Sequence, residues 1–133
     1  MTTTINAVAG TGLVSTSDGS GVCKVQSNGV TTNALAWVRF NGVTTVTIAS
    51  SYNISSVTRS GTGNYTVSFT NAAADANYSV IATAGDGTTN TIGYARSNSP
   101  IVPTTASFGL VSVNNAGSAF QDAAYFSAVV FGN

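Results

Sequence analysis

Residues 64–70 (NYTVSFT) decide the fold of this chain, because their side chains alternate between apolar and polar with a period of two. Tyr65, Val67 and Phe69 fall on one face, and threonine and serine fall on the other. This alternation is typical of a β-strand with one face in a core and the other in solvent. The stretch therefore predicts a half-buried strand.

Similar short segments recur on both sides of this strand. We predict further strands at residues 35–41, 43–49, 54–59, 77–84, 91–97, 106–113 and 124–131. Asn41-Gly42 and the SGTG stretch at 60–63 supply turn chemistry for tight hairpins. No window has sustained helical spacing, and only residues 71–76 and 118–124 could hold a helical turn. The fold class we predict is all-β, an antiparallel β-sandwich of jelly-roll type.

The apolar phase of each strand gives the expected core. Residues 35–41 (LAWVRFN) are apolar on both faces apart from Arg39, which is typical of a covered central strand with Trp37 in the core. The side chains that we expect to be mostly buried are Trp37, Phe40, Tyr65, Val67, Phe69, Tyr78, Val80, Phe108, Leu110 and Val129.

The first thirty residues have a different character. Thr, Ser and Gly dominate them, and their few apolar residues are not regularly placed. Such a segment buries little by itself but can add a strand to a neighbour. We therefore predict an extended N-terminal arm over residues 1–30, which contacts a particle or partner, followed by one sandwich domain over residues 31–133.

Composition argues against several classes of function. The chain has four Lys plus Arg, four Asp and no Glu, so 6% of its residues are charged, against about 25% in an average domain. Binding to nucleic acid backbones needs many cationic contacts. With no histidine, Ser-His-Asp and Cys-His nucleophile arrangements cannot be built. We expect no enzyme, no cofactor, no metal site and no nucleic acid partner.

Two further features of the sequence indicate no special function. Cys23 is the only cysteine, so it offers no disulfide framework and is best explained as a small apolar strand residue. No apolar stretch reaches 18 residues, so we expect no membrane insertion.

Three quoted stretches carry a resemblance to a known class of protein. SGVCKVQSNGVTT (20–32), ALAWVRFNG (34–42) and SVTRSGTGNYTVSFTNAAADANYSV (56–80) resemble modules of phage tail-fibre and virion-surface proteins. The second half resembles, at the level of its pattern, the trimeric sandwich of H-type lectins and fibre tips. The resemblance implies a non-enzymatic homotrimer that is assembled in the host cytoplasm, is located in the virion and contacts other capsid or tail proteins.

Two functions remain open at this point. One is a small decoration or fibre protein on the particle surface, and the other is a receptor-binding adhesin that recognises host surface glycans. For the adhesin, Asp86, Tyr94 and Arg96 form a candidate glycan site, in which the carboxylate and guanidinium bind hydroxyls and the ring stacks on the sugar. The neutral alternative makes Asp86 a turn residue and Tyr94 a core residue. Residues 86–90 lack the spacing of a calcium loop.

The C-terminal strand supplies the candidate oligomer interface. Its apolar residues occupy both phases, so one phase can fill the core while the other meets a neighbour. We assign Val129 to the core phase, and the candidate interface residues are Phe120, Phe126 and Val130.

Overall fold

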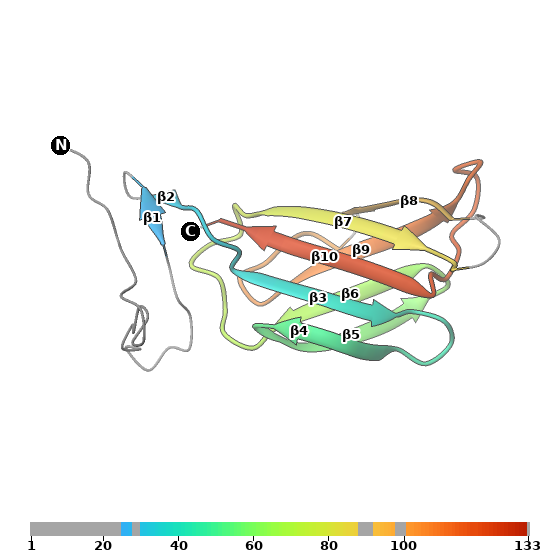
Figure 1. The fold of residues 1–133 in the computed structure, drawn as a ribbon, viewed down its shortest axis with the longest axis horizontal. Helices are drawn as coiled ribbons and strands as arrows, with labels where there is room; N and C mark the ends of the chain where they lie inside the picture. The colour runs from blue at the N-terminus through green and yellow to red at the C-terminus, as the bar shows by residue number, and fades with distance from the viewer. Residues whose placement is uncertain (1–24, 28–29, 88–91, 98–100, 133) are drawn as a thin grey trace, which may run out of the picture.

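The computed structural model describes residues 25–27, 30–87, 92–97 and 101–132, and these residues form strands and loops without a helix (Figure 1). The strands are β1 (Gln26–Ser27), β2 (Val30–Thr31), β3 (Ala36–Asn41), β4 (Thr47–Tyr52), β5 (Ile54–Gly61), β6 (Asn64–Phe69), β7 (Ser79–Gly85), β8 (Ile92–Ser97), β9 (Ser107–Asn114) and β10 (Tyr125–Phe131). The prediction of an all-β chain is therefore confirmed for the described residues.

Strands β3 to β10 form two antiparallel four-stranded sheets, with the orders β4-β3-β10-β7 and β5-β6-β9-β8. Apolar side chains of both sheets meet in one core, which gives a sandwich-like arrangement. The more specific jelly-roll topology is not confirmed by this strand order, in which β3-β4, β5-β6 and β8-β9 are each neighbours within one sheet.

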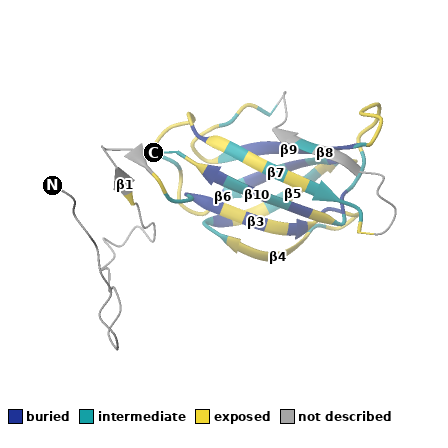
Figure 2. Ribbon diagram, turned by 45° about the horizontal axis from the view of Figure 1, so that its top comes forward, coloured by how far each residue is buried: buried dark blue, intermediate teal, exposed yellow. Residues whose placement is uncertain are grey.

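The core lies between the sheets and is rich in aromatic rings (Figure 2). The rings of Phe40 and Phe126 are stacked with centroids 5.0 Å apart, and Tyr65 from the opposite sheet meets both edge-on at 5.2 and 5.5 Å. A second group joins Phe69, Tyr78 and Phe108 at 5.4 to 6.1 Å. Such offset and edge-on pairs add to the stabilisation from burial. These contacts fix how the sheets face each other.

The alternation in β6 is confirmed, since Tyr65, Val67 and Phe69 are all buried. Of the other expected core residues, Phe40, Tyr78, Phe108 and Leu110 are also buried, and Val80 packs against the core while partly buried.

Two expected core residues are wrong, because Trp37 and Val129 belong to the outer phase of their strands. Trp37 is 38% exposed, and Val129 lies directly opposite it in the β3-β10 register. In β3 the inward phase is Ala36, Val38 and Phe40. The other phase contains Arg39, and burying an unpaired guanidinium would cost more free energy than burying Trp37 would return.

The second predicted strand is displaced. We expected residues 43–49 and a tight Asn41-Gly42 hairpin, but β4 spans Thr47–Tyr52 after a longer loop in which Thr44 has a φ of +55°. Gly42 serves a different purpose from a hairpin turn. It is buried, and a side chain there would collide with the hydroxyl of Tyr65. Its N–H donates a 2.8 Å hydrogen bond to the carbonyl of Ala123.

Most of the expected N-terminal arm, residues 1–24, lies outside the described residues. Within its last part, β1 pairs antiparallel with β2 in a small separate sheet. The described residues contain no helix with the length and apolar character needed to cross a bilayer.

Candidate functional site

The structure describes only part of the predicted glycan site. Asp86 follows the end of β7 and is partly buried. Tyr94 and Arg96 belong to β8, which borders β7 where the two sheets meet, but their side chains lie outside the described part of the structure. The grouping of these three residues therefore stays a prediction.

The predicted oligomer interface is wrong for two of its three residues. Phe126 and Val130 are 0% exposed and belong to the core cluster, so they cannot form an outer surface. The phase of β10 is the reverse of the expected one, because Phe126 and Val130 pair with the inward residues Phe40 and Ala36. Phe120, in the loop before β10, is 49% exposed and remains available to a neighbour.

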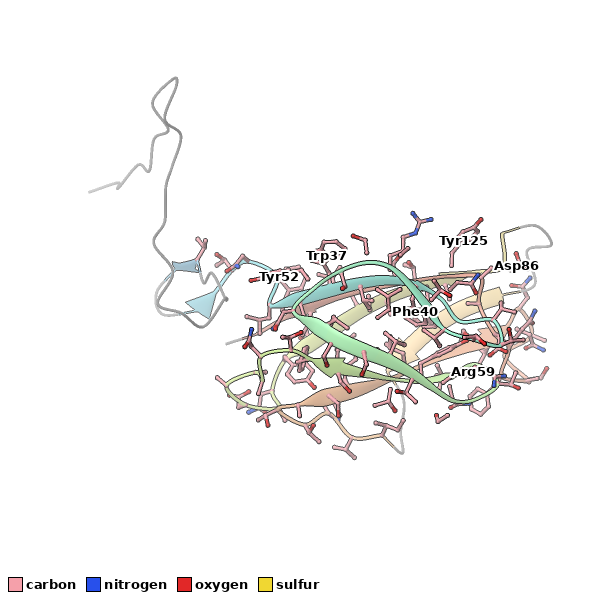
Figure 3. The ribbon with its side chains drawn as sticks, turned by 90° about the horizontal axis from the view of Figure 1, so that it is seen from below. Trp37, Phe40, Tyr52, Arg59, Asp86 and Tyr125 are labelled. Atoms are coloured by element: carbon pink, nitrogen blue, oxygen red, sulfur yellow. The ribbon has the colours of Figure 1, made fainter. Side chains whose placement is uncertain are left out.

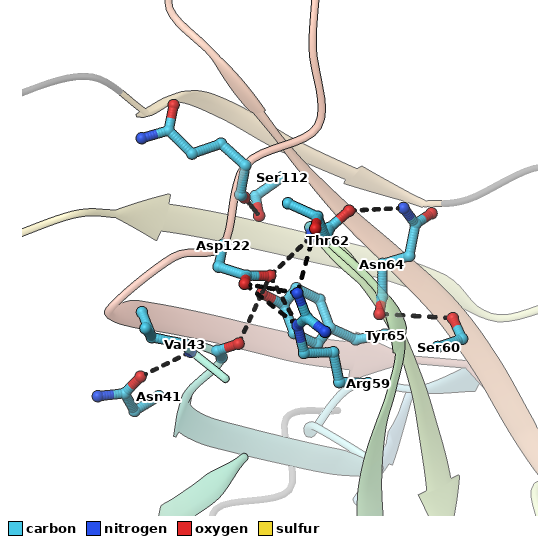
Figure 4. A network of polar contacts seen from close by, with 12 residues as sticks. Asn41, Val43, Arg59, Ser60, Thr62, Asn64, Tyr65, Ser112 and Asp122 are labelled. Atoms are coloured by element: carbon cyan, nitrogen blue, oxygen red, sulfur yellow. Dashed lines mark hydrogen bonds and ion pairs between the residues drawn. The ribbon is translucent and has the colours of Figure 1, made fainter. Parts of the chain in front are cut away.

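A polar network that the sequence did not indicate ties the β5-β6 hairpin to the segment before β10 (Figure 4). The Arg59 guanidinium donates to the Asp122 carboxylate through Nε at 3.0 Å and through a terminal nitrogen at 2.8 Å. The same carboxylate accepts the Gly63 N–H at 2.7 Å and the Tyr65 hydroxyl at 3.1 Å. Residues 59 and 122 are too far apart in sequence for any spacing rule to connect them.

These contacts change the acidity of two members of the network. Partial burial alone would raise the pKa of Asp122, but the hydrogen bonds from Arg59, Gly63 and Tyr65 outweigh it and lower that pKa. Burial, together with the nearby Asp122 charge, raises the pKa of Tyr65 to about 12. The carboxylate stays ionised and the hydroxyl stays protonated at neutral pH. Since both carboxylate oxygens already accept hydrogen bonds, the arrangement is suited to holding the fold together.

The lowered pKa of Asp122 predicts how stability depends on pH. A carboxyl whose pKa is lower in the folded state stabilises the fold above its unfolded pKa, about 3.9, and this contribution is lost as pH falls further. We expect the free energy of unfolding to fall below about pH 4 in the wild type. Asp122→Asn should be less stable at pH 6 by about 2 kcal/mol, with a much shallower acid decline.

Urea denaturation at pH 6 and pH 3 measures both effects. Asp75→Asn is the matched control, because the Asp75 carboxylate accepts a local hydrogen bond from the Asn77 N–H on an exposed loop and forms no ion pair with a described residue. An acid decline of equal slope in Asp122→Asn and in the wild type would contradict the prediction.

The outward face of sheet β4-β3-β10-β7 carries several exposed apolar side chains, among them Trp37, Ile81 and Tyr125. Tyr52, Trp37, Val129 and Ile81 stand directly opposite one another across its four strands. The next outward row consists of Ser50, Arg39, Ser127 and Thr83. Figure 3 shows Tyr52, Trp37 and Tyr125 along this side, with Phe40 beneath them between the sheets. We refer to these two rows together with Tyr125 as the outer face.

Arg39 and Tyr125 are in contact on the outer face. The guanidinium carbon of Arg39 lies over the Tyr125 ring, 5.5 Å from its centroid. The ring is 52% exposed and packs against Gly87, where a side chain would overlap it. Gly87 adopts a φ of +84°, which favours glycine. The sequence pattern did not indicate this surface, because it predicted Trp37 in the core and no role for Arg39.

Among the described residues, no three His, Cys, Asp or Glu side chains come together as metal ligands would. Comparison of the chain with protein-family models, with curated proteins and with solved structures found no match.

Proposed function

We propose that this protein is a non-enzymatic structural protein of a phage particle, a small homotrimeric decoration or fibre protein on the capsid or tail. The phage assignment is supported by the resemblance of residues 20–32, 34–42 and 56–80 to virion-surface modules. The assembly role is supported by the low charge of the chain and by one feature of its sheet edges.

That feature is the edge strand β4, and it carries the proposal. β4 ends its sheet, its residues Thr47 to Ser51 are exposed in both phases, and its sequence TIASSY has no charge and no proline. Monomeric proteins protect such edges with lysine, proline or a covering element, because unpaired backbone groups invite another strand. Among the described residues, the protection that the strand pairing shows is a bulge at Ala49. An edge of this kind is suited to contact with a second chain.

A closed ring explains how such an edge is used without uncontrolled growth. Contacts between different surfaces of identical chains form either a ring or an open filament. Three copies around an axis would cover one edge of each chain, and the phage resemblance favours three over two. Exposed Phe120 is a second candidate contact. Residues 1–30 remain our proposed contact with the particle.

Adding charge to β4 tests the assembly role. The double variant Thr47→Lys, Ser51→Lys changes two exposed side chains and places positive charges along the edge. A lysine on an edge strand opposes pairing with another chain, because its charge would lose water at the contact without gaining an acidic partner. We expect the wild type to have the mass of a trimer by light scattering at micromolar concentration, and the variant to have the mass of a monomer with unchanged far-UV circular dichroism.

The matched control is Ala72→Lys, Ala74→Lys, which adds the same charge to an exposed loop. It should remain trimeric. A monomeric wild type would overturn the trimer, and a trimeric β4 variant would move the interface away from this edge.

The alternative function, a receptor-binding adhesin, is favoured by the exposed aromatic side chains beside Arg39 on the outer face. Copy number distinguishes the two functions. A protein present at high copy number on purified particles is a capsid decoration, whereas a fibre tip is present in few copies.

A further inference from the structure

The surroundings of Arg39 combine three features of a ligand site. Trp37 and Arg39 are two residues apart on one strand, so their side chains leave the same face roughly 7 Å apart. Tyr125 lies on the other side of Arg39 and contacts its guanidinium. The cation is therefore placed between two exposed aromatic side chains.

Within the described part of the chain, Arg39 has no acidic partner. Its guanidinium forms no ion pair and no hydrogen bond with another described residue, in contrast to Arg59, which is paired with Asp122. The two rows and Tyr125 contain no carboxylate. An exposed cation without a carboxylate in these rows favours a ligand that carries negative charge. A planar guanidinium is well matched to a carboxylate, which it can bind through two parallel hydrogen bonds.

The remaining groups suit a sugar. The exposed rings of Trp37 and Tyr125 offer flat apolar surfaces for the C–H face of a pyranose. The neighbours of Arg39 in its row, Ser50 and Ser127, carry hydroxyls that bond to no other described residue. Beside Tyr125, Gly85 leaves open space, since a side chain there would meet nothing within 4 Å.

We propose that the outer face around Trp37, Arg39 and Tyr125 binds an acidic oligosaccharide, with a sugar carboxylate on the Arg39 guanidinium and pyranose rings against the aromatic side chains. The proposal rests on the receptor-binding alternative above and gives it a ligand class and a site other than Asp86, Tyr94 and Arg96. The site does not require trimer formation, because its side chains come from one chain.

A second copy of the chain fits this surface less well. Packing of this face against itself about a two-fold axis would bring the Arg39 side chains of the two copies close together, and like charges at a contact are unfavourable. An acidic peptide could satisfy Arg39, but it would leave the two exposed rings without the flat partner that a pyranose supplies.

The test is titration calorimetry of the full chain with four probes at low salt. Tetragalacturonate and a sialic acid trimer carry carboxylates, maltotetraose is a neutral sugar, and tetra-aspartate is an acidic peptide. We expect one or both carboxylated sugars to bind, with at least tenfold weaker binding of maltotetraose and tetra-aspartate. Affinity for the carboxylated sugar should fall as salt is added.

Variants locate the binding. Arg39→Gln and Trp37→Ala each change an exposed side chain and should weaken binding of the carboxylated sugar at least tenfold. Arg39→Lys keeps the charge but loses the paired donors, so its effect should be intermediate. Phe120→Ala removes an exposed aromatic side chain elsewhere and should bind like the wild type.

Three other results would contradict all or part of the proposal. Unchanged binding in Arg39→Gln and Trp37→Ala would overturn this site while leaving glycan recognition elsewhere on the chain. A wild type that binds neither carboxylated sugar would overturn the proposal itself. If tetra-aspartate bound as tightly as the carboxylated sugars, the site would be one for acidic peptides, which would also overturn it. The Arg39 and Trp37 variants should keep the assembly state of the wild type. A loss of sugar binding in them would then leave the proposed structural role untouched.

Discussion

Replacing Phe126 with alanine should lower the free energy of unfolding by about 4 kcal/mol, the typical cost of removing a fully buried phenylalanine side chain. Phe126 is 0% exposed, stacks on Phe40 and meets Tyr65 edge-on across the two sheets. The substitution would therefore leave a cavity where three aromatic rings now meet. A loss of this size is a large part of the 5–15 kcal/mol that stabilises a typical domain. In a thermal melt, the midpoint should fall by on the order of 10 °C.

The neighbouring residue in the same strand is the matched control. Tyr125 is 52% exposed on the outer face, so Tyr125→Ala removes a ring of similar size without opening the core. Its expected cost is about 1 kcal/mol or less, from the lost contact with Arg39 and Gly87. Equal losses in the two variants would contradict the assignment of the inward and outward phases of β10.

Replacing Gly63 with alanine should cost about 3 kcal/mol, for two separate reasons. Gly63 has a φ of +65°, a conformation that a side chain disfavours. An added Cβ would also lie 2.5 Å from the carbonyl oxygen of Ser112 and 2.7 Å from the amide nitrogen of Gln121. Both are backbone atoms, so relief requires the strand and loop to move apart. That movement would stretch the Gly63 hydrogen bonds to Asp122 and Ser112.

Gly61→Ala, two residues earlier in the same hairpin, is the matched control. It shows whether replacing any glycine of this hairpin lowers the free energy of unfolding. A Cβ at Gly61 would meet nothing within 4 Å, and its φ is not positive. Gly61→Ala should therefore change the free energy of unfolding by less than about 0.5 kcal/mol, or slightly increase it. Urea denaturation at pH 7 measures both variants, and a loss in Gly61→Ala as large as that in Gly63→Ala would refute the packing argument.

Local alternation allowed the sequence to predict most of the strands. Residues 64–70 predicted β6 because polar and apolar side chains alternate without exception there, and a slip by one residue would expose three large apolar groups. The SGTG stretch predicted the turn between β5 and β6, and Gly63 adopts the positive φ that this turn requires. Both predictions depend only on neighbours along the chain.

Alternation failed where both phases of a strand are apolar. In β3 the sequence did not separate Trp37 from Val38, and in β10 it did not separate Val129 from Val130. The sheet register settled both, because Trp37 and Val129 face each other on the side where Arg39 must remain outside. The error in β10 also placed Phe126 and Val130 at a surface that they do not reach. Choosing a phase required knowing which strands are neighbours.

By itself, the amino-acid sequence determined that this chain forms short antiparallel strands with little surface charge. Alternation and turn residues depend only on neighbours along the chain, and composition is a total over all residues. Only the tertiary structure decided that Asp122 pairs with Arg59 and Tyr65, and that Trp37, Arg39 and Tyr125 share one face. These contacts join segments that are far apart in the sequence. Their geometry depends on strand order and register, which are set by how well the two sheets pack as a whole and not by any short stretch of sequence.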